Sequence, residues 1–245
     1  MSSFLQRTEA LIGAQGIAKL SRAHVAVFGL GGVGGYVTEA LARSGIGALD
    51  LIDHDTFSLS NLNRQILATH ATIGRQKTDV AKERIEQINP ACKVTTFPVF
   101  FLPETADSFR FEQYDCVIDA IDTVSAKIEL AVRCKRAGTP LISSMGTGNK
   151  MDPSRLQLCD ISKTHTDPLA RVMRTELRKR GITHLLVVFS DEPPMTPHFE
   201  NEETEADPAT EPNVKKSVPG STAFVPSAAG LLLASAAVRG ILNGF

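Results

Sequence analysis

Five glycines lie within seven residues, because residues 29–35 read GLGGVGG. The mostly apolar residues 24–28 (HVAVF) before them predict a buried strand, and residues 33–44 predict a helix. Between a strand and a helix, glycines allow a tight turn and let a phosphate approach the backbone, and the helix N-terminus supplies amide donors. The cluster therefore predicts a nucleotide phosphate site, with a turn that only packs as the alternative. The glycines expected to act there are Gly29, Gly31, Gly32 and Gly34.

A carboxylate follows the next predicted strand, since Asp53 comes directly after residues 49–52. About 20 residues beyond such a glycine turn, a carboxylate accepts hydrogen bonds from both ribose hydroxyls of a nucleotide. The glycines and Asp53 fit NAD as well as ATP. These two features alone therefore leave a dehydrogenase open.

Cationic and amide side chains follow Asp53, in the segments DHDTFSLSNLNRQ (53–65) and GRQK (74–77). Attack at the α-phosphate of ATP needs cations around the departing pyrophosphate, because negative charge builds up there. The Arg64 guanidinium can bridge phosphate oxygens and the Lys77 ammonium can act as a point charge. Asn61 and Gln65 can add neutral hydrogen bonds. These residues favour ATP over NAD, although solvated surface charges are the alternative for Arg64 and Lys77.

A second carboxylate lies beyond the predicted strand 115–119, in the sequence DAIDT that ends with Asp122 and Thr123. The carboxyl ends of parallel strands face the ligand crevice of a doubly wound sheet. Oxygen ligands of this kind hold Mg²⁺ against phosphates. We therefore expect Asp122 to bind magnesium, with capping of the following helix as the alternative.

The elements that must position these residues alternate between strand and helix, which predicts a parallel sheet with right-handed crossovers. The fold class is thus α/β, a Rossmann-like doubly wound, mainly parallel sheet with an irregular C-terminal extension and a closing helix. We expect one adenylating domain over 1–245, with an ATP-binding core at 1–148, a substrate-facing extension at 149–245 and a mobile loop at about 200–216. Predicted helices are 5–20, 77–88, 124–137, 168–180 and 226–242, and further strands are 93–99, 140–144, 155–161 and 185–189.

The order of these motifs resembles the ubiquitin-activating-enzyme-like superfamily over residues 7–148. The resemblance implies that Asp53 holds the ribose, that Arg64 and Lys77 hold the triphosphate, and that Asp122 holds magnesium. Arg7 resembles the N-terminal arginine of that superfamily, which reaches the ATP of the other subunit. The resemblance therefore implies a homodimer in which Arg7 completes the catalytic set across the interface.

The spacing of the four cysteines helps to distinguish between branches of the superfamily. No two of them form a CxxC pair. No zinc is therefore expected. Activators that form thioesters need a cysteine after the ATP domain, and Cys159 lies in an apolar strand pattern typical of a buried structural thiol. The chain is thus equipped to adenylate a carboxylate but not to transfer sulfur.

Residues 145–155 (MGTGNKMDPSR) and 161–171 (ISKTHTDPLAR) resemble the tRNA threonylcarbamoyladenosine dehydratases. So do VVFS at 187–190 and the segments PGS and FVPS within 219–227. This resemblance implies that ATP adenylates the threonyl carboxylate of a modified adenosine beside the anticodon. The carbamoyl group then closes onto the activated carbonyl and expels AMP. A sulfur-relay protein is a further partner that this resemblance leaves open.

A tRNA needs a basic docking surface, although the formal net charge of the chain is −1. The predicted helix 168–180 places Arg171, Arg174 and Arg178 on one face, where counterion release can supply affinity for phosphates. Lys150 is expected to extend this patch. The alternative is a solvated helix face whose arginines pair with Glu176.

The location of the protein is expected to be cytoplasmic, because the N-terminus lacks the apolar core of a signal peptide. The apolar run 228–238 is too short to span a bilayer, so no integral membrane segment is expected. A peripheral membrane contact through this run stays open.

Three other functions compete with the dehydratase. An adenylyltransferase for a ubiquitin-like sulfur-carrier protein shares the ATP site, but the absent zinc cysteines and the basic helix argue against it. An NAD-dependent oxidoreductase leaves Arg64, Lys77 and Asp122 without a joint role. A non-catalytic ATP-binding protein conflicts with the presence of every expected site residue.

Overall fold

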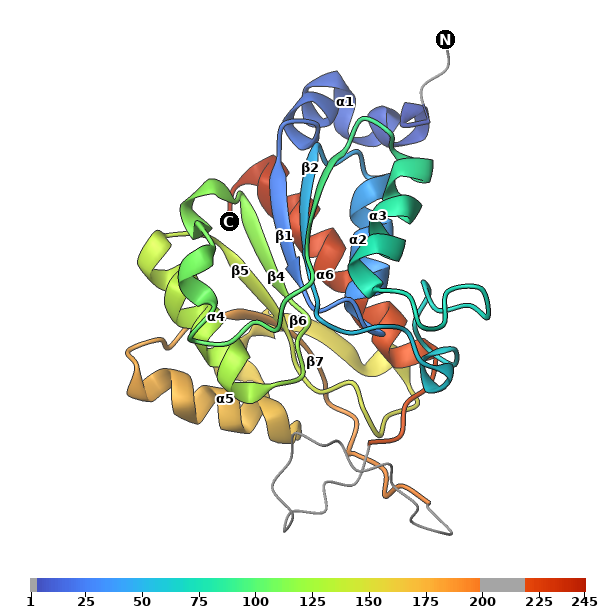
Figure 1. Ribbon diagram of the computed structural model, residues 1–245. Coiled ribbons are helices and arrows are strands. Elements are labelled where there is room, and N and C mark those ends of the chain that lie inside the picture. Colours follow the sequence, from blue (N-terminus) through green and yellow to red (C-terminus); the bar gives the residue numbers. More distant parts are fainter. Residues whose placement is uncertain (1–3, 199–218) are drawn as a thin grey trace.

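A seven-stranded sheet forms the centre of the computed structural model, which describes residues 4–198 and 219–245 (Figure 1). Its strand order is β3-β2-β1-β4-β5-β7-β6, and every neighbouring pair is parallel except β6 with β7. This arrangement confirms the predicted fold class. The strands are β1 (His24–Phe28), β2 (Ala48–Ile52), β3 (Lys93–Phe97), β4 (Cys116–Asp119), β5 (Leu141–Ser144), β6 (Leu156–Asp160) and β7 (Leu186–Ser190).

Helices cover both faces of the sheet. On one face α2, α3 and α6 pack with the apolar side chains of one core cluster, and on the other face α4 and α5 pack in a second cluster. The helix α1 packs against α6 and has a kink at Gly13. The helices are α1 (Gln6–Leu20), α2 (Gly34–Arg43), α3 (Lys77–Ile88), α4 (Val124–Ala137), α5 (Pro168–Lys179) and α6 (Phe224–Asn243).

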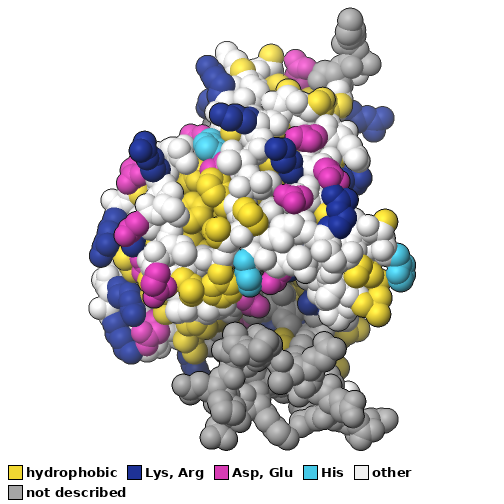
Figure 2. Space-filling model, viewed as in Figure 1, with side chains coloured by type: hydrophobic (Ala, Val, Ile, Leu, Met, Phe, Trp, Pro, Cys, Tyr) yellow, Lys and Arg dark blue, Asp and Glu magenta, His cyan; other side chains and the backbone are white. Residues whose placement is uncertain are grey.

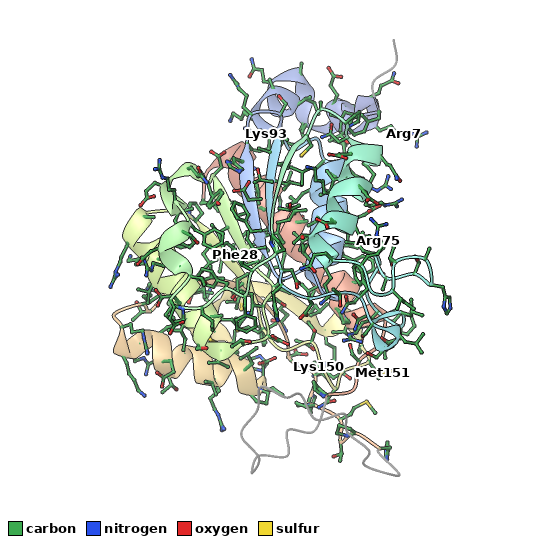
Figure 3. All side chains as sticks on the ribbon, viewed as in Figure 1. Arg7, Phe28, Arg75, Lys93, Lys150 and Met151 are labelled. Atoms are coloured by element: carbon green, nitrogen blue, oxygen red, sulfur yellow. The ribbon has the colours of Figure 1, made fainter. Side chains whose placement is uncertain are left out.

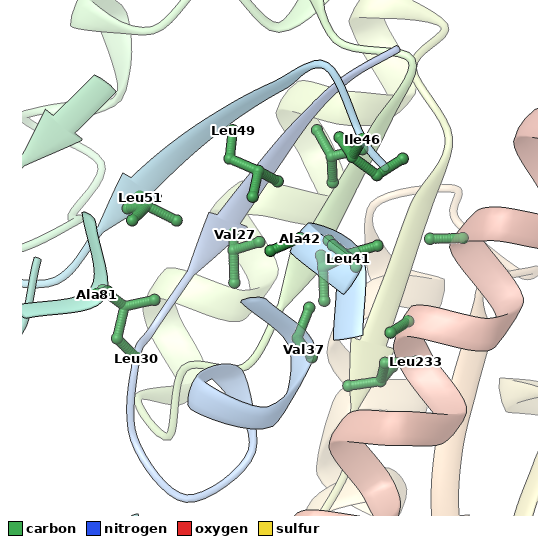
Figure 4. Packing of buried hydrophobic residues seen from close by; sticks show 14 of the residues in the cluster. Val27, Leu30, Val37, Leu41, Ala42, Ile46, Leu49, Leu51, Ala81 and Leu233 are labelled. Atoms are coloured by element: carbon green, nitrogen blue, oxygen red, sulfur yellow. The ribbon is translucent and has the colours of Figure 1, made fainter. Parts of the chain in front are cut away.

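The side chains of β1 are buried on both faces of the sheet. Val25 and Val27 pack into the cluster with α2 and α6, whereas Ala26 and Phe28 pack into the cluster with α4 and α5. All four side chains are 0% exposed, because β1 lies between β2 and β4 with helices on both faces. Figure 4 shows the first cluster, where side chains of β1, β2 and α2 meet Leu233 of α6. A strand buried on both faces needs the continuous apolar run that the sequence has.

The strands β1, β2, β4 and β5 run in the same direction, so their carboxyl ends share one edge of the sheet. The predicted elements all form with small shifts at their ends. β6 runs antiparallel to its neighbour, which a residue pattern alone does not reveal. The expected mobile loop at about 200–216 lies outside the described residues.

Candidate active site

A cleft of about 780 Å³ opens at the shared carboxyl edge of β1, β2, β4 and β5. Nearly every residue that the sequence analysis assigned to the nucleotide lines it. The second half of the chain contributes the loop after β5 and residues beside Pro219. The lining residues predicted for the nucleotide are Gly29, Gly31, Gly32, Asp53, Asn61, Arg64, Gln65, Lys77 and Asp122.

The glycine turn is built by two close backbone approaches. Gly29 has a φ of +89°, and a Cβ added there would lie 2.6 Å from the carbonyl oxygen of Ala120. A Cβ on Gly34 would lie 1.7 Å from the carbonyl oxygen of Gly29, so no side chain fits. Gly34 does not line the cleft and serves helix packing, whereas a Cβ on Gly31 would make only an ordinary contact with Gln65 Nε2 at 3.8 Å.

Asp53 ties this turn to the end of β2. Its Oδ2 accepts a hydrogen bond from the Leu30 amide at 2.6 Å, and its Oδ1 accepts one from the Asp55 amide at 2.9 Å. The residue is 9% exposed, at the boundary between core and cleft. The carboxylate therefore has a fixed orientation before any ribose binds.

Lys77 begins α3 and is 5% exposed, with its ammonium inside the cleft. Its Nζ lies 2.7 Å from Oδ2 of Asp55 and 4.0 Å from Oδ2 of Asp53. Lys77 is therefore not a solvated surface charge. The sequence analysis missed Asp55, although its place two residues after Asp53 on an extended segment was a usable signal.

Arg64 lies on the loop between β2 and α3, with its guanidinium held at the cleft. Its Nη1 donates to the Ser60 carbonyl and to Asn63 Oδ1, both at 2.9 Å. Burial lowers the pKa of Arg64 from its ordinary value, yet an arginine remains charged at neutral pH. Asn61 supports the same loop, because its Oδ1 accepts from the Ser58 amide.

Gln65 has an unsatisfied polar atom at this wall of the cleft. It is 6% exposed, and its Oε1 has no hydrogen-bond partner within the described part of the chain. A buried acceptor without a partner costs free energy, so such an atom needs a water or a ligand donor. Gln65 lines the cleft, so its side chain is suited to a hydrogen bond from a water or a ligand.

Asp122 is exposed in the cleft just before α4. The N-cap of α4 is Thr123, which has no side-chain cap hydrogen bond, so Asp122 does not cap the helix. Its Oδ1 accepts from the Thr123 hydroxyl at 3.4 Å, and it forms no ion pair with a described residue. An exposed carboxylate facing a phosphate site, without a cation of its own, fits the ligand chemistry of Mg²⁺.

Arg7 lies far from this cleft within one subunit. It is exposed on α1, near the end of the molecule where the strands begin, whereas Lys150 lies at the opposite end (Figure 3). It does not line the cleft formed by residues 4–198 and 219–245. Any contact of Arg7 with a nucleotide therefore requires a second copy of the chain.

Two residues predicted to contact nucleic acid have other roles. Lys150 is 2% exposed, and its Nζ donates to Asp167 Oδ2, the Gly146 carbonyl and the Ser190 carbonyl at 2.9–3.1 Å. Its ammonium therefore does not belong to an exposed basic patch, and Lys150 lines the cleft instead. Arg174 is half-buried and bonded to Thr164, whereas Arg171 and Arg178 are exposed as expected.

The N-terminus of α5 explains the burial of Lys150. Asp167 caps this helix, since its Oδ1 accepts from the Ala170 amide at 2.8 Å, and Pro168 occupies the first turn. Oδ2 of Asp167 accepts a hydrogen bond from the Lys150 ammonium. The loop after β5 is thereby joined to α5 through one buried ion pair.

The four cysteines take no part in the cleft lining made by the described residues. All four thiols are free, and Cys159 lies half-buried on β6. Burial raises the pKa of Cys159 above its ordinary value, and it raises the pKa of Cys92 to about 11. Such thiols are poor nucleophiles at neutral pH.

Comparison with known proteins agrees with this geometry. The sequence profile of the ThiF family matches residues 5–244. The tRNA threonylcarbamoyladenosine dehydratase of Bacillus subtilis (strain 168) is 45% identical over 238 residues, which are 97% of this chain and 94% of that protein. The adenylyltransferase and sulfurtransferase MOCS3 of Culex quinquefasciatus is 38% identical over 132 residues, only 54% of this chain and 30% of that protein.

The solved structures point to the same relatives. The structure of E. coli tRNA N6-threonylcarbamoyladenosine dehydratase, TcdA, in complex with AMP matches with a TM-score of 0.83 and 35% identity, over 96% of this chain and 92% of that chain. Its complex with ATP matches with a TM-score of 0.83 and 34% identity over the same shares.

Proposed function

The chain belongs to the ThiF family, and we propose from its near full-length similarity to the dehydratase of Bacillus subtilis that it is an ATP-dependent tRNA threonylcarbamoyladenosine dehydratase. The observation that carries the proposal is a single cleft in which the glycine turn, Asp53, Arg64, Lys77 and Asp122 meet. The related TcdA is described with AMP and with ATP, which supports ATP as the nucleotide of this cleft.

The proposed reaction has two steps. A threonyl carboxylate oxygen attacks the α-phosphorus of ATP, and the bond between the α-phosphorus and the bridging oxygen breaks to release pyrophosphate. The carbamoyl group then attacks the activated carbonyl, loses a proton to solvent and expels AMP. The nucleoside thereby loses one water and becomes cyclic.

The residues of this chain act in that reaction through position and charge. Arg64 and Lys77 stabilise the charge that builds up on the departing pyrophosphate, and Asp53 holds the ribose. Asp122 fits as the residue that would hold Mg²⁺, which supplies charge neutralisation at the phosphates when bound. No protein nucleophile is needed, which agrees with four thiols that lie outside the cleft lining of the described residues.

Arg171 and Arg178 are the residues that we propose for tRNA phosphates. Both are exposed on α5, and neither forms an ion pair with a described residue. Glu176 pairs instead with Lys179 and Arg180 at 2.6 and 2.9 Å. Figure 2 shows basic side chains at the edge formed by α4 and α5, with acidic side chains between them. The tRNA surface is therefore a few unpaired arginines rather than a continuous basic stripe.

The assembly and location of the protein belong to the same proposal. We infer a homodimer in which Arg7 reaches the cleft of the partner, a cytoplasmic location, and a sulfur-relay protein as a further partner. The helix α6 is long and apolar enough to cross a membrane by length and composition. However, Ala229 and Leu233 are 0% exposed in the core cluster, which supports α6 as a core helix.

The competing substrate is the C-terminal glycine of a ubiquitin-like sulfur-carrier protein, which the partial similarity to MOCS3 keeps in view. Pyrophosphate exchange with ATP separates the two substrates. Transfer RNA bearing threonylcarbamoyladenosine should support exchange, whereas unmodified tRNA and a carrier protein ending in Gly-Gly should not. Arg64→Ala should lower the rate by about 10²–10³, the loss typical of a deleted oxyanion donor. Exchange driven by the carrier protein alone would overturn the substrate assignment.

A further inference from the structure

Lys127 and Asp119 form an ion pair beneath the floor of the cleft. Lys127 lies on α4 and Asp119 is the last residue of β4, and both are 0% exposed. The Lys127 Nζ lies 2.9 Å from Oδ2 of Asp119. Neither residue lines the cleft that the described residues form, so neither can touch a bound nucleotide directly.

The pair holds the two consecutive peptide units that flank Ile121 in the cleft wall. Oδ1 of Asp119 accepts a hydrogen bond from the Ile121 amide at 3.1 Å, and the Lys127 Nζ donates to the Ile121 carbonyl at 3.0 Å. The Ser143 hydroxyl of β5 donates to Oδ2 of Asp119. Ile121 is therefore fixed at its amide and at its carbonyl, immediately before Asp122.

The same turn fits closely against the glycine turn. The Ala120 carbonyl occupies the space that a side chain at Gly29 would need. The Ala120 amide donates to the carbonyl of Phe28 at 2.8 Å. Residues 119–122 thus have little freedom to move relative to the phosphate site.

Stability alone does not account for a fully buried ion pair. Removing two charges from water is costly, and apolar side chains of similar volume are often as stabilising or more so. Here Lys127 donates a hydrogen bond to the Ile121 carbonyl, and Asp119 accepts one from the Ile121 amide. Both charged groups therefore hold the segment directly before Asp122. Such buried polar contacts are suited to setting a geometry.

We propose that Lys127 and Asp119 are positioning residues that aim the Asp122 carboxylate at the metal and phosphates of the cleft. The inference rests on the proposed magnesium role of Asp122 and adds the residues that orient it. Groups behind a metal ligand commonly change metal affinity by about 10–100-fold when they are replaced.

Binding of Mn²⁺ tests the proposal without using activity. The titration uses the full chain with a non-hydrolysable ATP analogue, and electron paramagnetic resonance measures free Mn²⁺. Lys127→Met should weaken Mn²⁺ binding by about tenfold, while binding of the analogue without a divalent ion changes little. Amide hydrogen exchange at Ile121 should become faster, because its carbonyl loses a donor and its turn loosens.

A control exists in a buried carboxylate outside the cleft. Asp50→Asn changes a residue that is 3% exposed and lies 2.9 Å from His24 Nε2, and Asp50 does not line the cleft of the described residues. It should leave Mn²⁺ affinity unchanged. If Lys127→Met alone does not fold, the neutral double variant Asp119→Asn/Lys127→Met avoids an unpaired buried charge and carries the same expectation.

The results distinguish the metal role of Asp122 from the positioning role of Lys127 and Asp119. If Asp122→Asn leaves Mn²⁺ affinity unchanged, the metal role of Asp122 itself is wrong. If Asp122→Asn weakens Mn²⁺ binding but Lys127→Met and the double variant do not, the positioning role is wrong. Weakening by Asp50→Asn to the same extent would show a general effect of losing a buried pair and would also overturn the inference.

Discussion

The Nζ of Lys77 lies 2.7 Å from Oδ2 of Asp55 inside the nucleotide cleft. A backbone hydrogen bond from the Lys77 amide to the Asp55 carbonyl joins the same two residues at 3.0 Å. The ammonium that is proposed for the triphosphate therefore already has an anionic partner. Nucleotide phosphates must compete with Asp55, so the pair keeps the lysine oriented at a cost in affinity.

The substitution Asp55→Asn should tighten binding of ATP in the absence of divalent ions. It removes a competing carboxylate that is about half exposed, so the gain should be about two- to fivefold, as for other partly exposed ion pairs. Isothermal titration calorimetry measures the change. Asp79→Asn on the exposed side of α3 is the control and should bind ATP like the parent chain. Equal affinity of the Asp55 variant and the parent would mean that Asp55 does not compete.

Replacement by alanine should cause different defects at Gly34 and at Gly31. Gly34→Ala places a Cβ 1.7 Å from the Gly29 carbonyl oxygen, and overpacking of this kind costs about 1–3 kcal/mol or more. Gly31→Ala meets only the Gln65 Nε2, at 3.8 Å, and should fold normally but obstruct the phosphates. Urea unfolding and ATP titration distinguish them. A stable Gly34 variant, or a Gly31 variant with parental ATP affinity, contradicts the account.

Sequence reasoning located the cleft because parallel strands end at one edge. Asp53 and Asp122 each follow a buried strand, and that position alone predicted that they meet. The burial of Lys150 depends on Asp167, seventeen residues away and on another element, so no local pattern shows it. Lys127 is hidden for a similar reason, since a lysine in a helical pattern normally faces solvent. Buried pairs between distant elements are the part of this site that requires the three-dimensional structure.

Salt dependence tests the proposed tRNA contacts on α5. If Arg171 contacts a phosphate, Arg171→Gln should weaken tRNA binding and reduce the slope of log affinity against log salt by about 0.7–0.9. Lys179→Gln removes the same charge from a residue that already pairs with Glu176 at 2.6 Å. It should change the slope little. Equal changes for both variants would indicate a general charge effect rather than a defined contact.

The pH dependence of stability should report on Asp50. Burial raises the pKa of Asp50, but hydrogen bonds from His24 and Tyr114 outweigh it and hold the pKa below its ordinary value of 3.8. A depressed carboxyl pKa stabilises the folded state above the unfolded value, and that contribution disappears as the pH falls through the folded value.

Urea unfolding between about pH 5 and pH 3 measures this contribution. The parent chain should lose stability over this window more steeply than Asp50→Asn, which cannot titrate there. Glu104→Gln, at an exposed position, should follow the parent. Parallel curves for the parent and the Asp50 variant would mean that Asp50 makes no such contribution.

In the proposed reaction, a threonyl carboxylate oxygen attacks the α-phosphorus of ATP. The most direct measurement uses tRNA whose threonylcarbamoyladenosine carries ¹⁸O in that carboxylate, with mass spectrometry of the released nucleotide and the digested nucleoside. Adenylation of the carboxylate should give AMP that contains one ¹⁸O, together with a nucleoside that has lost one water. Unlabelled AMP, or release of ADP and phosphate, would contradict adenylation of the carboxylate.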